Sequence, residues 1–297
     1  MRYHLVALFT IAAWGLTFVS TKVLLVDFSP LWILAIRFLI GYLVLCALRP
    51  RILRARERAH EWLFALAGAT GVAAYYLLEN VALVYTTATA VGVTVAVAPL
   101  LTAIIAALRG DRSALSIRFF GGFVMAIAGL ILVGVGTDDS AQADASSYLA
   151  YVGDLLALLA ALAWAVYSLV VKRIGELGYE TIASTKRTFF WGLVLIIPTA
   201  VMFDGDLPPL SEACAPENIA NMLFLGLIAS AACFVTWGIA VRHLGVIATS
   251  TYIYMVPAIT AVASALMLGE VLTLPIVAGL ALTVMGLVLS QMPKRKA

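Results

Sequence analysis

Residues 87–107 read TATAVGVTVAVAPLLTAIIAA and contain no charged side chain. As a helix, a run of about 20 apolar residues is long enough to cross the roughly 30 Å hydrocarbon core of a bilayer. Comparable runs recur along the whole chain, at 3–22, 30–48, 61–82, 117–135, 151–171, 182–203, 219–240, 246–267 and 273–291. Together with residues 87–107 they predict ten transmembrane helices.

The overall composition is that of a chain embedded in lipid. Of its 297 residues, 63% are hydrophobic and 12% are charged, and the mean hydropathy is +1.05. Soluble domains contain roughly 45–50% apolar and about 25% charged residues, so a water-soluble protein is excluded. A signal peptide is the alternative explanation of residues 1–13, because Arg2 precedes an apolar stretch. A similar segment later in the chain favours a transmembrane helix at this place, because a signal peptide would not be repeated there.

The basic residues alternate between loops, which sets the orientation. Most of the 19 Lys and Arg residues lie near residue 2, in 49–58, 109–118 and 172–187, at 242 and in 294–296. The opposite loops are acidic and carry Asp138, Asp139, Asp144, Asp204, Asp206, Glu212 and Glu217. By the positive-inside rule the basic loops and both termini are cytoplasmic. Topology explains the net charge of +3, and no nucleic-acid partner is expected.

The two halves of the chain resemble each other. Trp14, Lys22 and Arg37 are each followed 150 residues later by the same residue type, at Trp164, Lys172 and Arg187. Later in each half the offset is 158, which pairs Glu79 with Trp237 and Pro99 with Pro257. An internal repeat of this kind indicates two related structural units.

Five spans in each half require the halves to insert in opposite orientations. The predicted fold is an all-α integral membrane protein of ten transmembrane helices, arranged as two inverted five-helix repeats. The repeats are residues 1–135 and 151–297, and an extracytoplasmic linker of residues 136–150 joins them. Inverted repeats allow a midplane site to open alternately to either side, which favours a carrier over a channel.

Several ordered motifs carry a family resemblance. They are Trp14-Gly15, Lys22, Pro30 and Arg37-Phe38, then ENVALVYTTA at 79–88 before Pro99, then Trp164-Ala165 and Lys172, and finally Pro257 before Leu268-Gly269-Glu270. In order and spacing they resemble the EamA family of the drug/metabolite transporter superfamily. The first half departs from the pattern, with Asp111 where the second has Glu270. The resemblance implies export of amino acids or related metabolites across a bacterial inner membrane, without ATP.

Motifs for catalysis are absent from the sequence. It contains no GxxxxGK[ST], HExxH or GxSxG pattern, and Cys46, Cys214 and Cys233 form no CxxC pair. We expect no enzyme, cofactor or metal site. The expected partners are a small-molecule substrate, the lipid bilayer and a coupling proton, for a monomer or homodimer. The leading function is export of amino acids or related metabolites. Export of small amines or cationic compounds is the alternative, and a non-transporting scaffold is a third reading.

Aromatic residues near the middle of spans are candidates for the substrate cavity, because tryptophan usually lies at the membrane interfaces instead. These candidates are Trp14, Trp164, Tyr167, Tyr252 and Tyr254. Simple packing in an aromatic core is the alternative for each.

Glu79 is the candidate for charge recognition. On translocon scales the free energy of inserting an acidic residue at the centre of a helix is about +2.5 to +3.5 kcal/mol, so a partner, water or a function should offset this cost. At the outer mouth it would attract an ammonium group or take up a proton, with Tyr75, Tyr76 and Asn80 as neighbours. Its repeat counterpart, Trp237, would lie at the opposite mouth. An interfacial carboxylate or a structural partner of Arg37 is the alternative.

The remaining candidates are structural or gating residues. Lys22 and Lys172 are expected to anchor span ends in the interface. Arg37, about two turns into its span, is expected to bond helix-end carbonyls or a carboxylate. Pro99 and Pro257 are expected to break their helices, either along the substrate path or for packing. Glu270 completes this group.

Overall fold

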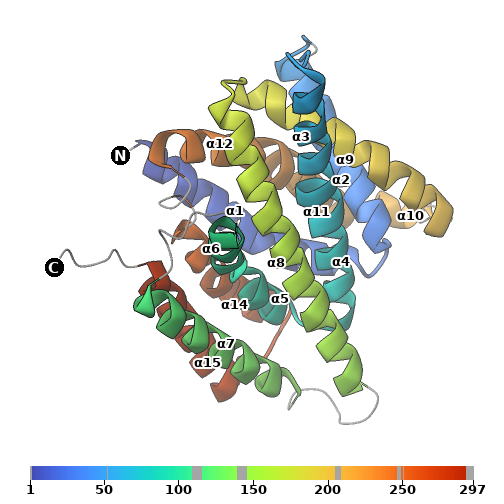
Figure 1. Cartoon of the computed structure of the whole chain (residues 1–297). Coiled ribbons are helices and arrows are strands. Elements are labelled where there is room, and N and C mark those ends of the chain that lie inside the picture. Colours follow the sequence, from blue (N-terminus) through green and yellow to red (C-terminus); the bar gives the residue numbers. More distant parts are fainter. Residues whose placement is uncertain are drawn as a thin grey trace.

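The computed structural model describes residues 2–51, 53–108, 116–138, 146–204, 209–245, 249 and 251–291, and contains no strand within them (Figure 1). Seven helical segments in these ranges are long and apolar enough to cross a membrane, namely Arg2–Leu24, Pro30–Leu48, Arg58–Tyr85, Ala88–Leu108, Tyr148–Glu176, Thr181–Phe203 and Pro216–Leu244. Shorter apolar helices are Ile117–Val133, Tyr252–Met267 and Leu274–Ser290. Apart from Thr87, Ala96, Val97 and Thr273, the described part of each range predicted to span is thus helical, as a multi-pass membrane protein requires.

The first half contains helices whose ends follow local sequence signals. Helix α2 begins at Pro30, and the Ser29 side chain accepts a hydrogen bond from the Trp32 amide at 3.3 Å, which caps the helix. The elements of this half are α1 (Arg2–Leu24), α2 (Pro30–Leu48), α3 (Arg58–Gly68), η1 (Ala69–Ala74), α4 (Tyr75–Tyr85), α5 (Ala88–Val95), α6 (Ala98–Leu108) and α7 (Ile117–Asp138).

The second half begins with the longest described helix and, like the first half, contains a π-helix between two α-helices. Its elements are α8 (Ser146–Glu176), α9 (Thr181–Phe203), α10 (Leu210–Ala213), α11 (Pro216–Leu223), η2 (Phe224–Ala232), α12 (Cys233–Leu244), η3 (Thr251–Met255), α14 (Val256–Met267) and α15 (Leu274–Gln291). Helices α7 and α8 both extend into the predicted linker of residues 136–150, because each continues past its apolar run. Residues 139–145 of that linker, and Asp111, lie outside the described residues.

Breaks in the helices occur at matching places in the two halves. Both η1 and η2 are π-helices in the middle of a long apolar segment, a feature often found at functional sites. Pro99 lies in the first turn of α6, just after α5 ends, and Pro257 lies in the first turn of α14, just after the 3-10 helix η3. Proline fits a first turn because no intrahelical partner awaits its missing N–H group.

The halves pack against each other reciprocally. Segments α3, η1 and α4 contact α8 and α9, whereas η2 contacts α1 and α2, and α11 and α12 contact α1. Helices α7 and α15 lie side by side (Figure 1), with Gly122 close to Gly286 and Gly129 close to Gly279. A Cβ atom at Gly122 would lie 2.3 Å from the Gly286 carbonyl oxygen, so glycine is what allows this close approach.

Candidate functional site

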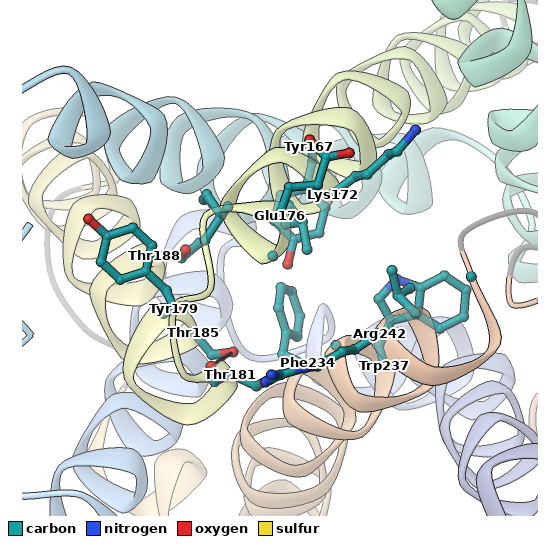
Figure 2. Close-up of a pocket in the computed structure, with 17 residues that line it drawn as sticks. Tyr167, Lys172, Glu176, Tyr179, Thr181, Thr185, Thr188, Phe234, Trp237 and Arg242 are labelled. Carbon is teal, nitrogen blue, oxygen red and sulfur yellow. Dashed lines mark hydrogen bonds between the residues drawn. The ribbon is translucent and has the colours of Figure 1, made fainter. Parts of the chain in front are cut away.

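A cavity of about 330 Å³ lies between α8, α9 and α12. In Figure 2, side chains from α8 face side chains from α12 across it, and α9 forms a third wall. Hydroxyl groups line one part of the cavity, and they belong to Tyr167, Thr181, Ser184, Thr185 and Thr188. Charged residues of both signs, Lys172, Glu176 and Arg242, border another part. The Glu176 carboxylate forms an ion pair with Arg173 at 3.2 Å, and the Lys172 ammonium points away from the cavity (Figure 2). The cavity therefore offers hydrogen bonds to a small polar molecule, and its charged residues lie at the border.

The charged part of the cavity lies at the end of the bundle where basic residues gather, called here the basic end. Arg49 forms an ion pair with Glu180 at 3.0 Å, and the Arg56 amide donates to the Tyr179 hydroxyl at 2.9 Å. Tyr179 also lines the cavity, so the loop after α2 and the start of α9 border its mouth.

Five buried aromatic side chains, called here the aromatic floor, pack together where the cavity ends inside the protein. They are Trp14, Trp164, Tyr167, Phe234 and Trp237. Ring centroids lie 5.2 Å apart for Trp14 and Trp164, 5.1 Å for Trp14 and Trp237, and 4.9 Å for Trp164 and Tyr167. The Trp14 indole donates to the Ala229 carbonyl of η2 at 3.0 Å, which fixes its orientation.

A smaller cavity of about 30 Å³ lies on the other side of the aromatic floor. Trp14, Trp164, Tyr75 and Tyr76 line it, whereas Tyr167, Phe234 and Trp237 line the larger cavity. The aromatic floor therefore separates the two spaces, and a substrate would have to pass it. Three predicted residues, Trp14, Trp164 and Tyr167, meet here, although they come from two different helices.

The opposite end of the bundle, called here the acidic end, is held together by polar contacts. The Ser29 hydroxyl and the Leu31 amide both donate to the Asp204 carboxylate, the second at 3.2 Å. Asn218 donates to the Asp27 carboxylate at 2.7 Å. These bonds tie the region between α1 and α2 to α9 and α11.

Lys22 and Glu270 join elements at the acidic end. The Lys22 ammonium donates to the carbonyls of Leu83 and Thr86, the second at 2.8 Å, where α4 ends. The Glu270 carboxylate accepts from the Ala88 amide at 2.8 Å and the Thr89 hydroxyl at 2.7 Å, where α5 begins. Lys22 is therefore not the interfacial anchor predicted, because unpaired carbonyls at a helix end offer it acceptors inside the protein. Its counterpart Lys172 is exposed at the large cavity.

Arg37 and Glu79 are fully buried in the first half. The Arg37 guanidinium donates through Nε to the Ser230 hydroxyl at 3.1 Å and lies 4.3 Å from the centroid of the Tyr76 ring. Glu79 lies near Arg37 and the Tyr75 hydroxyl, but it forms no ion pair within 4.0 Å with any described residue. The prediction that Arg37 bonds a helix-end carbonyl or a carboxylate is wrong, because α2 turns its side chain toward η2.

Four further predicted residues lie elsewhere than expected. Asn80 donates to the Pro30 carbonyl at 3.0 Å, so it ties α4 to α2 instead of assisting Glu79. The Tyr252 hydroxyl contacts His4 Nδ1 at 2.5 Å, and Tyr254 packs in a separate core with Leu100 and Phe119. The reason is the 3-10 geometry of η3, which turns Ile253 toward the small cavity in their place. Trp237 belongs to the aromatic floor, not to a mouth opposite Glu79.

Two features of the cavity were not predicted from the sequence. Phe234 precedes Trp237 by three residues, and this spacing places both on one face of a helix. The second feature is the hydroxyl stripe of Thr181, Ser184, Thr185 and Thr188, whose spacing also follows one helical face. Polar residues on one face of an otherwise apolar span were the available signal for the hydroxyl stripe, and two large aromatic residues three positions apart were the signal for Phe234 and Trp237.

A helical bundle of membrane-spanning length, with a polar cavity leading to a buried aromatic floor, defines the class of multi-pass membrane transporters. The sequence matches the EamA-like transporter family over residues 1–135 and 151–292, and the chain belongs to this family. The resemblance seen in the sequence is thereby confirmed.

Similar proteins come from archaea and bacteria. An uncharacterized transporter of Archaeoglobus fulgidus is 28% identical over 265 residues, which cover 88% of this chain and 87% of the relative. A probable terminal-alkyne amino-acid exporter of Streptantibioticus cattleyicolor is 27% identical, with coverages of 88% and 84%. The uncharacterized transporter YvbV of Bacillus subtilis is 27% identical, with coverages of 95% and 89%. A protein crystal structure with 22% identity has the same fold, with a TM-score of 0.66 over 97% of this chain and 96% of its own.

Proposed function

We propose that the protein exports amino acids or related small metabolites by alternating access, without ATP hydrolysis. The observation that carries this proposal is the cavity that joins charges of both signs to an aromatic floor. Lys172 and Arg242 suit the carboxylate of an amino acid, and Phe234 suits an apolar side chain. Glu176 suits the ammonium group when it exchanges its ion pair with Arg173, at 3.2 Å, for the substrate. The likeness to the Streptantibioticus exporter supports the same substrate class.

The proposal includes the membrane arrangement. Ten helices form two inverted five-helix repeats, with both termini cytoplasmic, in a bacterial inner membrane. The reciprocal packing of α1 and α2 on η2, and of α8 and α9 on η1, supports this arrangement. With the basic end in the cytoplasm, the large cavity faces inward and the acidic end is closed to the outside.

Labelling of single cysteines tests the orientation. In a background with Cys46, Cys214 and Cys233 replaced by alanine, a membrane-impermeant maleimide should modify a Glu217→Cys variant on intact cells, and it should modify an Arg58→Cys variant only after permeabilisation. Both positions are exposed at opposite ends of the bundle. The reverse pattern would show that the orientation is wrong.

Export of small amines or cationic compounds is the second candidate, favoured by the aromatic floor itself. The ring centroids of Trp164 and Trp237 lie 5.2 and 5.1 Å from that of Trp14, with the Trp164 ring edge-on and the Trp237 ring tilted. The faces of aromatic rings attract cations that have been stripped of water. Amino acids and amines both carry an ammonium group. Whether a substrate needs a carboxylate therefore distinguishes the two candidate functions.

Counterflow in proteoliposomes tests the function directly. The panel contains amino acids, the amines that lack their carboxylate, nucleobases and sugars, each measured with and without a proton gradient. Amino-acid counterflow supports the leading proposal, whereas flux of the amines alone supports the second. Dependence on the gradient would assign the coupling proton, for which the buried carboxylate of Glu79 is the proposed carrier. No flux from folded, inserted protein would favour a non-transporting scaffold.

A further inference from the structure

Several buried polar side chains in the first half have atoms without a hydrogen-bond partner among the described residues. These atoms are Thr21 Oγ1, Trp32 Nε1, Arg37 Nη1 and Nη2, Glu79 Oε1 and Oε2, Asn80 Oδ1 and Thr86 Oγ1. Thr21, Arg37, Glu79 and Asn80 have no exposed surface in this structure. Burial of polar groups without partners is costly, and native proteins rarely tolerate it without a reason.

The close contacts between helices show which residues of the two halves correspond. A Cβ atom at Gly226 in η2 would lie 3.2 Å from the Arg37 carbonyl oxygen, and one at Gly68, beside η1, would lie 2.7 Å from the Thr188 carbonyl oxygen. Because Gly68 and Gly226 are 158 residues apart, Arg37 corresponds to Thr188. The sequence comparison had paired it with Arg187, so that pairing is wrong by one residue.

Aromatic contacts repeat the same register. The rings of Phe38 and Tyr76 lie 5.0 Å apart, and those of Phe189 and Phe234 also lie 5.0 Å apart. In this register four of the six residues have counterparts in the wall of the large cavity, whereas the counterparts of Trp32 and Thr86, which are Ala183 and Leu244, do not line it. The pairs are Thr21 with Val171, Arg37 with Thr188, Glu79 with Trp237, and Asn80 with Gly238.

From this correspondence we infer that the protein has a second ligand site at the acidic end, between α1, α2 and α4. The site is closed in this state. Thr21, Arg37, Glu79 and Asn80 form its wall, and they are buried only while the large cavity is open. The inference rests on the alternating access proposed above, in which each half takes in turn the arrangement of the other. It explains why these groups lack partners here.

Lys22 is the group that keeps this site closed. It binds the carbonyls of Leu83 and Thr86, so it fastens the end of α1 to the end of α4. In the second half the counterparts Lys172 and Val241 both line the open cavity, and the Lys172 ammonium has no hydrogen bond to any residue that the structure describes. The ends of α1 and α4 are thus joined at the closed end of the bundle, whereas the corresponding ends of α8 and α12 lie apart at the open cavity.

The chemistry of the closed site selects a small zwitterion. The Arg37 guanidinium has two unused nitrogens, which suit a carboxylate bidentately, and the Glu79 carboxylate suits an ammonium group. The two charges lie near each other without forming an ion pair, so a ligand that carries both opposite charges can bind each of them. Tyr76, the counterpart of Phe234, supplies an aromatic face for the rest of the ligand.

A buried reporter tests whether the site exists. Leu34 is 1% exposed, and its counterpart Thr185 lines the large cavity. In a variant with Cys46, Cys214 and Cys233 replaced by alanine, Leu34→Cys should react slowly with an impermeant thiol reagent added outside. Adding Lys22→Met should accelerate the reaction about tenfold or more, since removal of a charged hydrogen-bond donor is worth that factor in an opening equilibrium. The matched change Lys172→Met should not accelerate it. No acceleration by Lys22→Met would refute the closed site.

Protection of the same reporter tests the ligand. L-leucine, L-phenylalanine or L-threonine should slow labelling of the Lys22→Met variant, whereas isoamylamine and 4-methylpentanoate, which carry one charge each, should not. Glu79→Gln and Arg37→Gln should abolish the protection, and Arg37→Lys serves if Arg37→Gln does not fold. No protection by any amino acid, or equal protection by a singly charged analogue, would overturn the zwitterion assignment. Labelling needs no flux, so intact protection without counterflow would refute only the export function.

Discussion

The substitution Gly71→Ala tests how closely the aromatic floor depends on the π-helix η1. A Cβ atom at Gly71 would lie 2.2 Å from Cδ2 and 2.3 Å from Cγ of the Tyr167 ring. Ordinary carbon contacts are about 3.5–4.0 Å, so the ring must move. It is held between Trp164 and Phe234, and the large cavity that it lines offers open space beside it.

The expected change in the free energy of unfolding of Gly71→Ala follows from two opposing effects. Overpacking a well-packed core costs typically about 1–3 kcal/mol, and here the clash includes Cγ, which moves only if χ1 of Tyr167 rotates or the backbone of α8 shifts. Alanine is favoured over glycine in a helix by about 0.5–1 kcal/mol. We therefore expect a net loss of about 1–2 kcal/mol, together with a narrower cavity. At Gly121 in α7 nothing lies within 4 Å of the added atom, so Gly121→Ala should leave stability unchanged or slightly raised.

Thermal unfolding in lipid nanodiscs and counterflow of the identified substrate measure the two consequences. Gly71→Ala should lower the melting temperature and slow transport, most of all for bulky substrates. The double variant Gly71→Ala/Tyr167→Ala should be no less stable than Tyr167→Ala, because the clash is gone. If Gly71→Ala melts and transports like Gly121→Ala, the packing argument is wrong.

Three further substitutions test separate parts of the structure. Glu270→Gln removes the charge that accepts from Ala88 and Thr89 at the start of α5, and should lower stability by about 1–2 kcal/mol, measured by the melting temperature; an unchanged value would mean that the capping bonds contribute nothing. Replacement of Trp14 or Trp164 by alanine should change substrate affinity or selectivity while membrane insertion stays intact, and normal affinity in both variants would assign the rings to packing alone. Glu79→Gln should slow flux and flatten its pH dependence, because an amide cannot exchange a proton; the same pH profile as the parent protein would reject proton coupling at this residue.

The sequence predicts how deep in the membrane each residue of the candidate site lies, but not the direction in which its side chain points. Trp14 and Trp164 were expected to meet because the repeat places both at mid-span, and their rings do lie together. Tyr252 and Tyr254 occupy a comparable depth but point elsewhere, because η3 adopts 3-10 geometry. Depth follows from counting residues, whereas direction depends on the local helix type, which an apolar sequence does not reveal.

By itself the sequence determined the helices and their family. Apolar length, prolines such as Pro30 and Pro257, and the order of the repeated motifs are local properties, and they act through backbone hydrogen bonding and the cost of polar groups in lipid. Only the tertiary structure decided the partners of charged residues. Lys22 reaches carbonyls 61 and 64 residues away, and Glu270 caps a helix in the other half of the chain. The partner of a buried charged side chain is the polar group that packing brings near it. Which group that is depends on the rotation and register of whole helices against each other.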